Sequence, residues 1–109
     1  MKVELTLVLK TTERAYATLE SIKKAGYNAT IMTTESLRHA VDYYPGEHTF
    51  INLRQIEQRE AFESILGVFI VDGERLDDLK KVIRECTKNF SEIKGFMYSR
   101  AIDDFEGSI

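Results

Sequence analysis

Ile65-Leu66-Gly67-Val68-Phe69-Ile70-Val71, followed by the turn signal Asp72-Gly73, is the longest unbroken apolar run in this chain. The run is rich in β-branched and aromatic side chains, which favour strands. An apolar run this short and this continuous is typical of a strand that is buried on both faces. We therefore predict that it forms a central strand of a sheet.

The first strand-helix-strand pattern of the chain spans residues 3–32. Apolar residues alternate with polar ones at its start, which predicts a strand with one apolar face. Thr11 or Thr12 is placed to cap the helix that follows, and Gly26 stands where a left-handed residue ends that helix. A second strand is predicted from Tyr27 to Met32.

The second strand-helix-strand pattern spans residues 65–102. A helix follows the apolar run, because apolar residues recur at helical spacing along one of its faces. They are Leu76, Leu79, Val82, Ile83 and Cys86. Asn89 is the candidate for the C-terminal cap of this helix, and Ile93 to Ile102 predicts the last strand.

Two such units fold most simply into an α+β, ferredoxin-like βαββαβ sandwich, in which both helices cover one face of an antiparallel sheet. Residues 1–109 then form a single domain, with the first and third strands at its centre. The other face of the sheet also carries apolar side chains and needs cover, which predicts a homo-oligomer. The candidates for that face are Val8, Met32, Phe96 and Tyr98.

A long insertion separates the second strand from the third and covers residues 33–64, where a hairpin needs only a handful of residues. Within it we predict a short helix that carries Leu37, Ala40, Val41 and Tyr44. A short strand is predicted after that helix, from His48 to Leu53. Tyr43, Tyr44 and Phe50 are candidate contacts for a partner protein, because aromatic side chains often anchor interfaces. The alternative is that they form a small satellite core beneath the insertion.

Composition limits the classes of partner. The 109-residue chain has a net charge of -3 and a pI of about 5.4, whereas nucleic-acid binding needs a basic face. Phe96 and Tyr98 on a strand are similar to an RNA-binding surface, but the RNA-recognition signature motifs are missing.

No apolar run approaches the roughly 20 residues of a membrane span, so we expect no membrane insertion. A single cysteine and an N-terminus unlike a signal peptide favour a cytoplasmic location.

Catalytic signatures are missing from the sequence, which has no Gly-rich phosphate loop, paired-carboxylate motif or Ser/His constellation. We therefore expect a protein that is not an enzyme and needs no cofactor. His39 and His48, with Asp42 and Glu47 between them, could form a metal site, but their spacing matches no standard zinc signature. Cys86 lies on an apolar helix stripe, which favours a small buried hydrophobe over a reactive thiol.

The segment after the second helix, Thr87-Lys88-Asn89-Phe90-Ser91-Glu92-Ile93-Lys94-Gly95-Phe96, aligns without gaps to the pattern T-G-x-x-G-D-G-K-x-F. That pattern is the phosphate-binding loop of the nitrogen-regulatory PII proteins and their relatives. Two further features fit the pattern of these proteins. One is the strand at the start of the chain, which ends at Lys10, and the other is the long insertion between the second and third strands. The chain therefore resembles the PII-like signalling superfamily.

This resemblance implies a non-enzymatic regulatory trimer with small-molecule sites in the clefts between subunits. It implies a small anionic ligand, with an adenine nucleotide favoured, bound by Thr87, Lys88 and Lys94. Residues 33–64 would report the bound ligand to a partner protein. The glycines of the family loop are replaced here by Lys88, Ser91 and Ile93, although glycines allow backbone amides to approach phosphates.

Three alternatives therefore stay open at the level of the sequence. The pattern of Lys88 and Lys94 favours two solvated lysines near a helix end over an anion site. The loss of the glycines favours a ferredoxin-like protein-interaction module that binds no small ligand. A metal-binding protein of CutA type is the third possibility, and it lacks an evident set of ligands.

Overall fold

The computed structural model of this chain describes residues 1–43 and 64–109. Their order of elements alternates strands with helices, as the two strand-helix-strand patterns predict. The elements are β1 (Lys2–Lys10), α1 (Glu13–Lys24), β2 (Thr30–Thr34), α2 (Leu37–Tyr43), β3 (Ser64–Asp72), the 3-10 turn η2 (Gly73–Arg75), α4 (Leu76–Thr87) and β4 (Gly95–Ala101).

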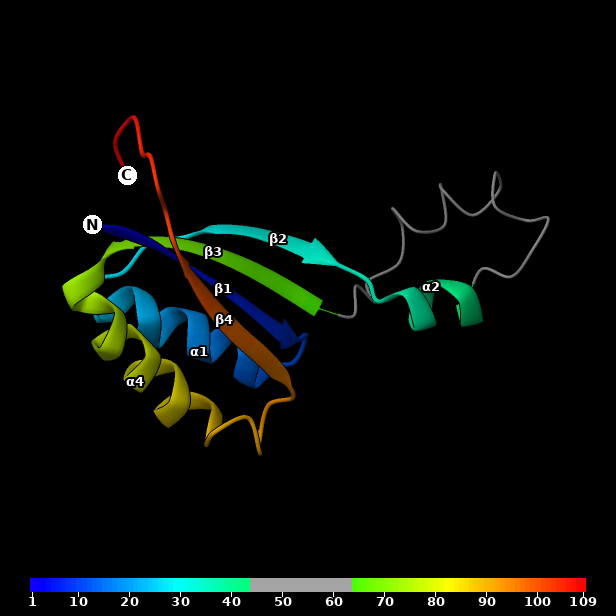
Figure 1. The fold of residues 1–109 in the computed structure, drawn as a ribbon. Helices are drawn as coiled ribbons and strands as arrows, with labels where there is room; N and C mark the ends of the chain where they lie inside the picture. The colour runs from blue at the N-terminus through cyan, green and yellow to red at the C-terminus, as the bar shows by residue number, and fades with distance from the viewer. Residues whose placement is uncertain (44–63) are drawn as a thin grey trace.

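The four strands form one sheet in the order β2-β3-β1-β4, and each strand is antiparallel to its neighbours. The first and third strands are therefore central, as predicted. Helices α1 and α4 lie side by side on one side of the sheet (Figure 1). The architecture is α+β and compatible with a ferredoxin-like fold. None of the helices in the described part of the chain is long and apolar enough to cross a membrane.

Helix α1 begins and ends where the sequence indicates. The Thr12 hydroxyl accepts a hydrogen bond from the Ala15 amide at 3.1 Å, which satisfies one of the amides that a helix start leaves without a partner. Gly26 follows the helix with a φ of 98°, in the left-handed region that glycine adopts at little cost. These two signals are local, which is why the sequence alone located them.

Strand β2 begins three residues later than predicted. Tyr27 lies before the strand, and its buried phenol donates a hydrogen bond to Asp78 while the Arg75 guanidinium covers its ring at 4.5 Å. The Asn28 side chain accepts from the Ala29 amide at 2.9 Å, a local bond typical of turns. The chain therefore uses residues 27–29 to cross from α1 to the sheet edge.

Strand β3 is buried on only one of its two faces, which corrects the prediction from the apolar run. Its odd-numbered residues face the helices and are buried, whereas Leu66, Val68 and Ile70 are only half-buried. The helix-side core is completed by β1, in which Leu5 pairs with Phe69 and Leu7 pairs with Gly67. An apolar run reports the chemistry of both faces, but it does not say which face the same chain covers.

Helix α4 ends in an unusual turn. Its C-terminal cap is Lys88, one residue before the predicted Asn89. Lys88, Asn89 and Phe90 all have a left-handed φ, between 54° and 61°, which is uncommon for residues other than glycine. Of the positions where the PII-like pattern has glycine, Lys88 is left-handed here, whereas Ser91 and Ile93 are not. The turn leads into β4 at Gly95.

Candidate functional site

The side of the sheet opposite α1 and α4, called the open face below, is largely apolar at its centre. Phe96 and Tyr98 stack there with ring centroids 6.5 Å apart, and each is more than half exposed. The strand register places the even-numbered residues of all four strands on this face. Its apolar members are Met32, Val8, Leu66, Val68, Ile70, Phe96 and Tyr98.

Two ion pairs border one end of the open face. The Lys2 ammonium lies 2.8 Å from the Asp72 carboxylate, and the Arg100 guanidinium lies 3.2 Å from the Glu4 carboxylate. The hydrogen bond and the positive charge of Lys2 lower the pKa of Asp72 below its ordinary value. An apolar centre with a charged border is the anatomy of a protein interface.

A pocket of about 430 Å³ lies at the opposite end of the open face, and we call it the lysine pocket. Four segments that are distant in the sequence meet there: the end of β1, the start of β4, and the two stems of the insertion. The described residues that line it are Val8, Lys10, Thr34, Glu35, Ser36, Ser64, Lys94, Gly95 and Phe96.

Lys10 and Lys94 give this pocket its cations. The Lys10 amide donates a hydrogen bond to the Lys94 carbonyl oxygen at 2.8 Å, which holds the two backbones together. Across residues 1–43 and 64–109, neither ammonium has an ion-pair partner. Glu35 is the one carboxylate among the described lining residues. The pocket thus presents two cations beside one carboxylate, together with three hydroxyl side chains.

Gly95 is essential to the shape of this site. A Cβ at this position would overlap the carbonyl oxygen of Val8, so no larger residue fits without moving the backbone of β1 or β4. Gly95 corresponds to a variable position in the PII-like pattern. Its requirement therefore comes from the close approach of two strands, a signal that the sequence pattern did not reveal.

The predicted ligand residue Thr87 lies inside the fold. Its side chain is fully buried at the end of α4. The hydroxyl donates to the Ile83 carbonyl oxygen at 2.9 Å and accepts from the Phe90 amide at 3.1 Å. Lys88, the second predicted ligand residue, is exposed and is not among the residues that line the lysine pocket. Of the three predicted ligand residues, Lys94 is the one that the fold places in the pocket.

In the turn after α4, the backbone amides of residues 88–92 donate hydrogen bonds within the turn or to α4. The amides of Lys88 and Asn89 donate to the Arg84 carbonyl oxygen, and the Glu92 amide donates to the Thr87 carbonyl oxygen at 3.2 Å. The Phe90 amide donates to the Thr87 hydroxyl, and the Ser91 amide donates to the Lys88 carbonyl oxygen, both at 3.1 Å. An anion bound at residues 88–92 would therefore be held by side chains, because these backbone amides already have hydrogen-bond acceptors.

Several predicted residues cannot be placed. Tyr44 and Phe50, two of the predicted partner contacts, lie outside the described residues, as do His48 and Glu47 of the hypothetical metal site. The backbone of Tyr43 ends α2, but its side chain is outside the description. Within the described ranges, no group of three or more His, Cys, Asp or Glu residues is placed to hold a metal ion.

Sequence reasoning missed Lys10 as a site residue. From the sequence, Lys10 was identified only as the end of the first strand. Its place in the pocket follows from the strand register, because Lys10 pairs with Ser64 across the sheet. Lys94, just before β4, lines the same pocket. Even-numbered positions in β1 point to the open face, so parity could have placed Lys10 there. Only the strand order brings it to Lys94.

No family model matches this chain, and no curated protein matches it.

Proposed function

We propose that this chain is a non-enzymatic, PII-like regulatory protein that binds a small anionic ligand in the lysine pocket. The observation that carries the proposal is the meeting of Lys10 and Lys94 at a pocket that both stems of the insertion also line. Ammonium groups without an ion-pair partner attract phosphate or carboxylate oxygens. An adenine nucleotide is the ligand that the family resemblance favours.

The position of the pocket suggests how a bound ligand would act on the insertion. Thr34 and Ser64 pair across β2 and β3 at the point where the chain leaves and re-enters the sheet. Both residues line the pocket, so a ligand would contact the two stems at once. Its binding free energy would then favour one arrangement of the insertion over others. Residues 33–64 would present that arrangement to a partner protein.

The open face supports an oligomer as part of this function. Exposed apolar surface that is continuous over four strands is a feature of association sites. Phe96 belongs both to that surface and to the lining of the lysine pocket. A second copy on the open face would therefore turn the pocket into a cleft between subunits. We propose a homotrimer, in accordance with the resemblance.

The first test is thermal unfolding of the chain with ATP, ADP, AMP and cyclic dinucleotides. A ligand at about 100 times its dissociation constant stabilises by roughly 2.7 kcal/mol, which shifts the melting temperature of a domain of this size by on the order of 10 °C. Lys94→Gln and Lys10→Gln should each weaken binding by about tenfold or more, because each removes a charged hydrogen-bond donor. Lys81→Gln, an exposed lysine of α4, is the matched control.

The outcomes separate the pocket from the turn. If a nucleotide shifts the melt and Lys88→Gln abolishes the shift while Lys94→Gln does not, the site is the turn after α4 and the lysine pocket is not the binding site. If no member of the panel shifts the melt, the small-ligand function is wrong.

The second candidate function, a ferredoxin-like interaction module without a small ligand, would then take its place. The bonded amides of residues 88–92 favour it, because these backbone donors are already used within the turn or on α4 and are not free for phosphate oxygens.

A further inference from the structure

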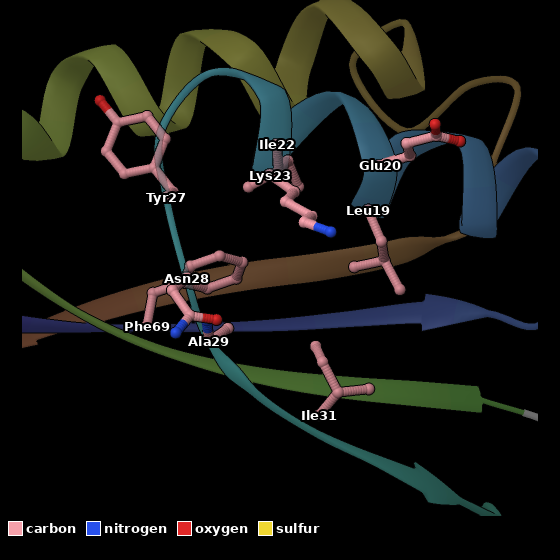
Figure 2. Close-up of a pocket in the computed structure, with 9 residues that line it drawn as sticks. All are labelled: Leu19, Glu20, Ile22, Lys23, Tyr27, Asn28, Ala29, Ile31 and Phe69. Carbon is pink, nitrogen blue, oxygen red and sulfur yellow. The ribbon is translucent and has the colours of Figure 1, made fainter. Parts of the chain in front are cut away.

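A second pocket of about 270 Å³ lies on the helix side of the sheet, between α1 and the segment that leads into β2 (Figure 2). Among the described residues, none lines both this pocket and the lysine pocket. Its floor is apolar and deeply buried, formed by Ile22, Tyr27 and Phe69. Its rim is formed by the more exposed Leu19, Ile31 and Lys23. We call it the α1–β2 pocket.

Gly67 allows two side chains that line this pocket to pack close to the backbone of β3. A Cβ at Gly67 would lie 3.1 Å from Cδ1 of Ile31 and 3.3 Å from Cε1 of Phe69, both of which line the pocket. The two side chains therefore settle against the bare backbone of β3. A glycine within a central strand often marks such a close approach. Ile31 and Phe69 therefore line the pocket in positions that close packing against Gly67 fixes.

Lys23 brings a positive charge to the mouth of this apolar space. Figure 2 shows its side chain descending from α1 with the ammonium directed into the space between Leu19 and Phe69. In the described part of the chain this ammonium has no hydrogen-bond or ion-pair partner. Glu20, on the same rim, is already paired with Lys24 at 3.4 Å, and its carboxylate points away from the pocket.

We propose that the α1–β2 pocket binds a small monocarboxylate with an apolar tail, such as a short- or medium-chain fatty acid. The tail lies against Ile22, Ile31 and Phe69, and the carboxylate pairs with the Lys23 ammonium. The size fits, because an apolar cavity of roughly 150 Å³ lined by similar side chains holds benzene. The charge fits, because an anionic head group is the one that an ammonium at the mouth would hold.

Titration of the full chain with octanoate, followed by NMR, tests the site directly. We expect shifts that saturate at Leu19, Ala29 and Ile31. Hexanoate should bind about fifteenfold more weakly, because it is two methylenes shorter and each buried methylene contributes roughly fourfold in affinity. Octanol, which has the same tail without the charge, should bind about fivefold more weakly than octanoate, the factor expected for an exposed ion pair.

Two variants test the two halves of the site. Lys23→Gln should weaken octanoate by about fivefold and leave octanol unchanged, whereas Lys81→Gln, a lysine remote from the pocket, should change neither. Ala29→Leu fills the pocket from its rim and should prevent binding of both, while thermal unfolding verifies that this variant folds.

Three results would overturn the proposal. The first is the absence of saturable shifts at the pocket. The second is a set of octanoate shifts confined to Phe96 and Tyr98, which would place the amphiphile on the open face. The third is equal loss of octanoate and octanol in Lys23→Gln, which would make Lys23 a packing residue and not a partner for the carboxylate.

Discussion

The two faces of the sheet are built from similar residues but have different surroundings. Along β3, Ile65 and Phe69 are almost fully buried under α1 and α4, whereas their neighbours Leu66 and Val68 remain half-buried on the open face. The strand is apolar at both sets of positions. The difference teaches that a strand can be apolar on both faces when the described part of the chain buries only one of them. The apolar residues of the other face are then suited to contact another molecule.

The largest effect is expected from a matched pair of truncations on β3. Ile65→Ala should cost about 2–5 kcal/mol in the free energy of unfolding, because it leaves a cavity in the helix-side core. Leu66→Ala removes a side chain of the same size from the open face and should cost about 1 kcal/mol in the separated chain. Urea unfolding at low protein concentration measures both. Equal losses in the free energy of unfolding for the two variants would show that the two faces of β3 are equally buried.

The second prediction concerns the assembly that the open face would support. Phe96→Ser combined with Tyr98→Ser removes the stacked rings from that face. Each ring that becomes buried on association contributes roughly 1.5–3 kcal/mol, so the assembled mass should fall to the 12.6 kDa of one chain. Sedimentation equilibrium measures this mass. Folding should survive, because neither ring belongs to the helix-side core. A native chain that already sediments at 12.6 kDa would contradict the oligomer.

Two threonines extend the comparison to polar groups. Thr87 is fully buried at the end of α4, and Thr87→Val leaves the Phe90 amide without its partner, which should cost about 1–3 kcal/mol. Thr6 lies on the open face, where its hydroxyl donates to Glu4 at 3.1 Å. Thr6 is itself almost fully buried, but Thr6→Val leaves no donor without a partner and Glu4 keeps its ion pair with Arg100, so this substitution should cost about 1 kcal/mol or less. Urea midpoints compare the two variants. A cost for Thr6→Val as large as that of Thr87→Val would mean that the open face is as tightly packed as the core.

The smallest effect is a pH dependence at the border of the open face. Lys2 lowers the pKa of Asp72 in the folded chain, so this pair stabilises the fold above the unfolded-state pKa. That contribution is lost as the pH falls through the folded-state pKa. Asp72→Asn should therefore lose stability at neutral pH and lose less on acidification than the native chain. Unfolding in urea at about pH 7 and about pH 3 measures the difference. The same acid-side decline in both proteins would contradict the pairing.

Features of the fold that depend on neighbours in the sequence were predictable. Periodicity located the strands and helices, Thr12 and Gly26 marked the ends of α1, and the repeated strand-helix-strand pattern indicated a sheet with β1 and β3 at its centre. The start of β2 was misplaced because Tyr27 has the character of a strand residue while its phenol is held by Asp78, fifty-one positions away. The cap at Lys88 was missed because a left-handed lysine has no clear signal in the sequence.

The candidate site was only partly predictable for the same reason. Lys94 was found because it stands in a recognisable pattern, but Lys10 and Gly95 matter through strand register, which joins residues far apart in the chain. Thr87 matched the pattern too, and the fold shows its hydroxyl bonded inside the turn.

By itself, then, the amino-acid sequence determined the elements, their order and the apolar character of both sheet faces, because these depend on side-chain chemistry repeated at short intervals. Tertiary structure alone decided which face is covered, which lysines meet at the insertion, and where a pocket with a cation at its mouth lies beside α1. These depend on distances between residues that only the packing of the sheet and helices brings together.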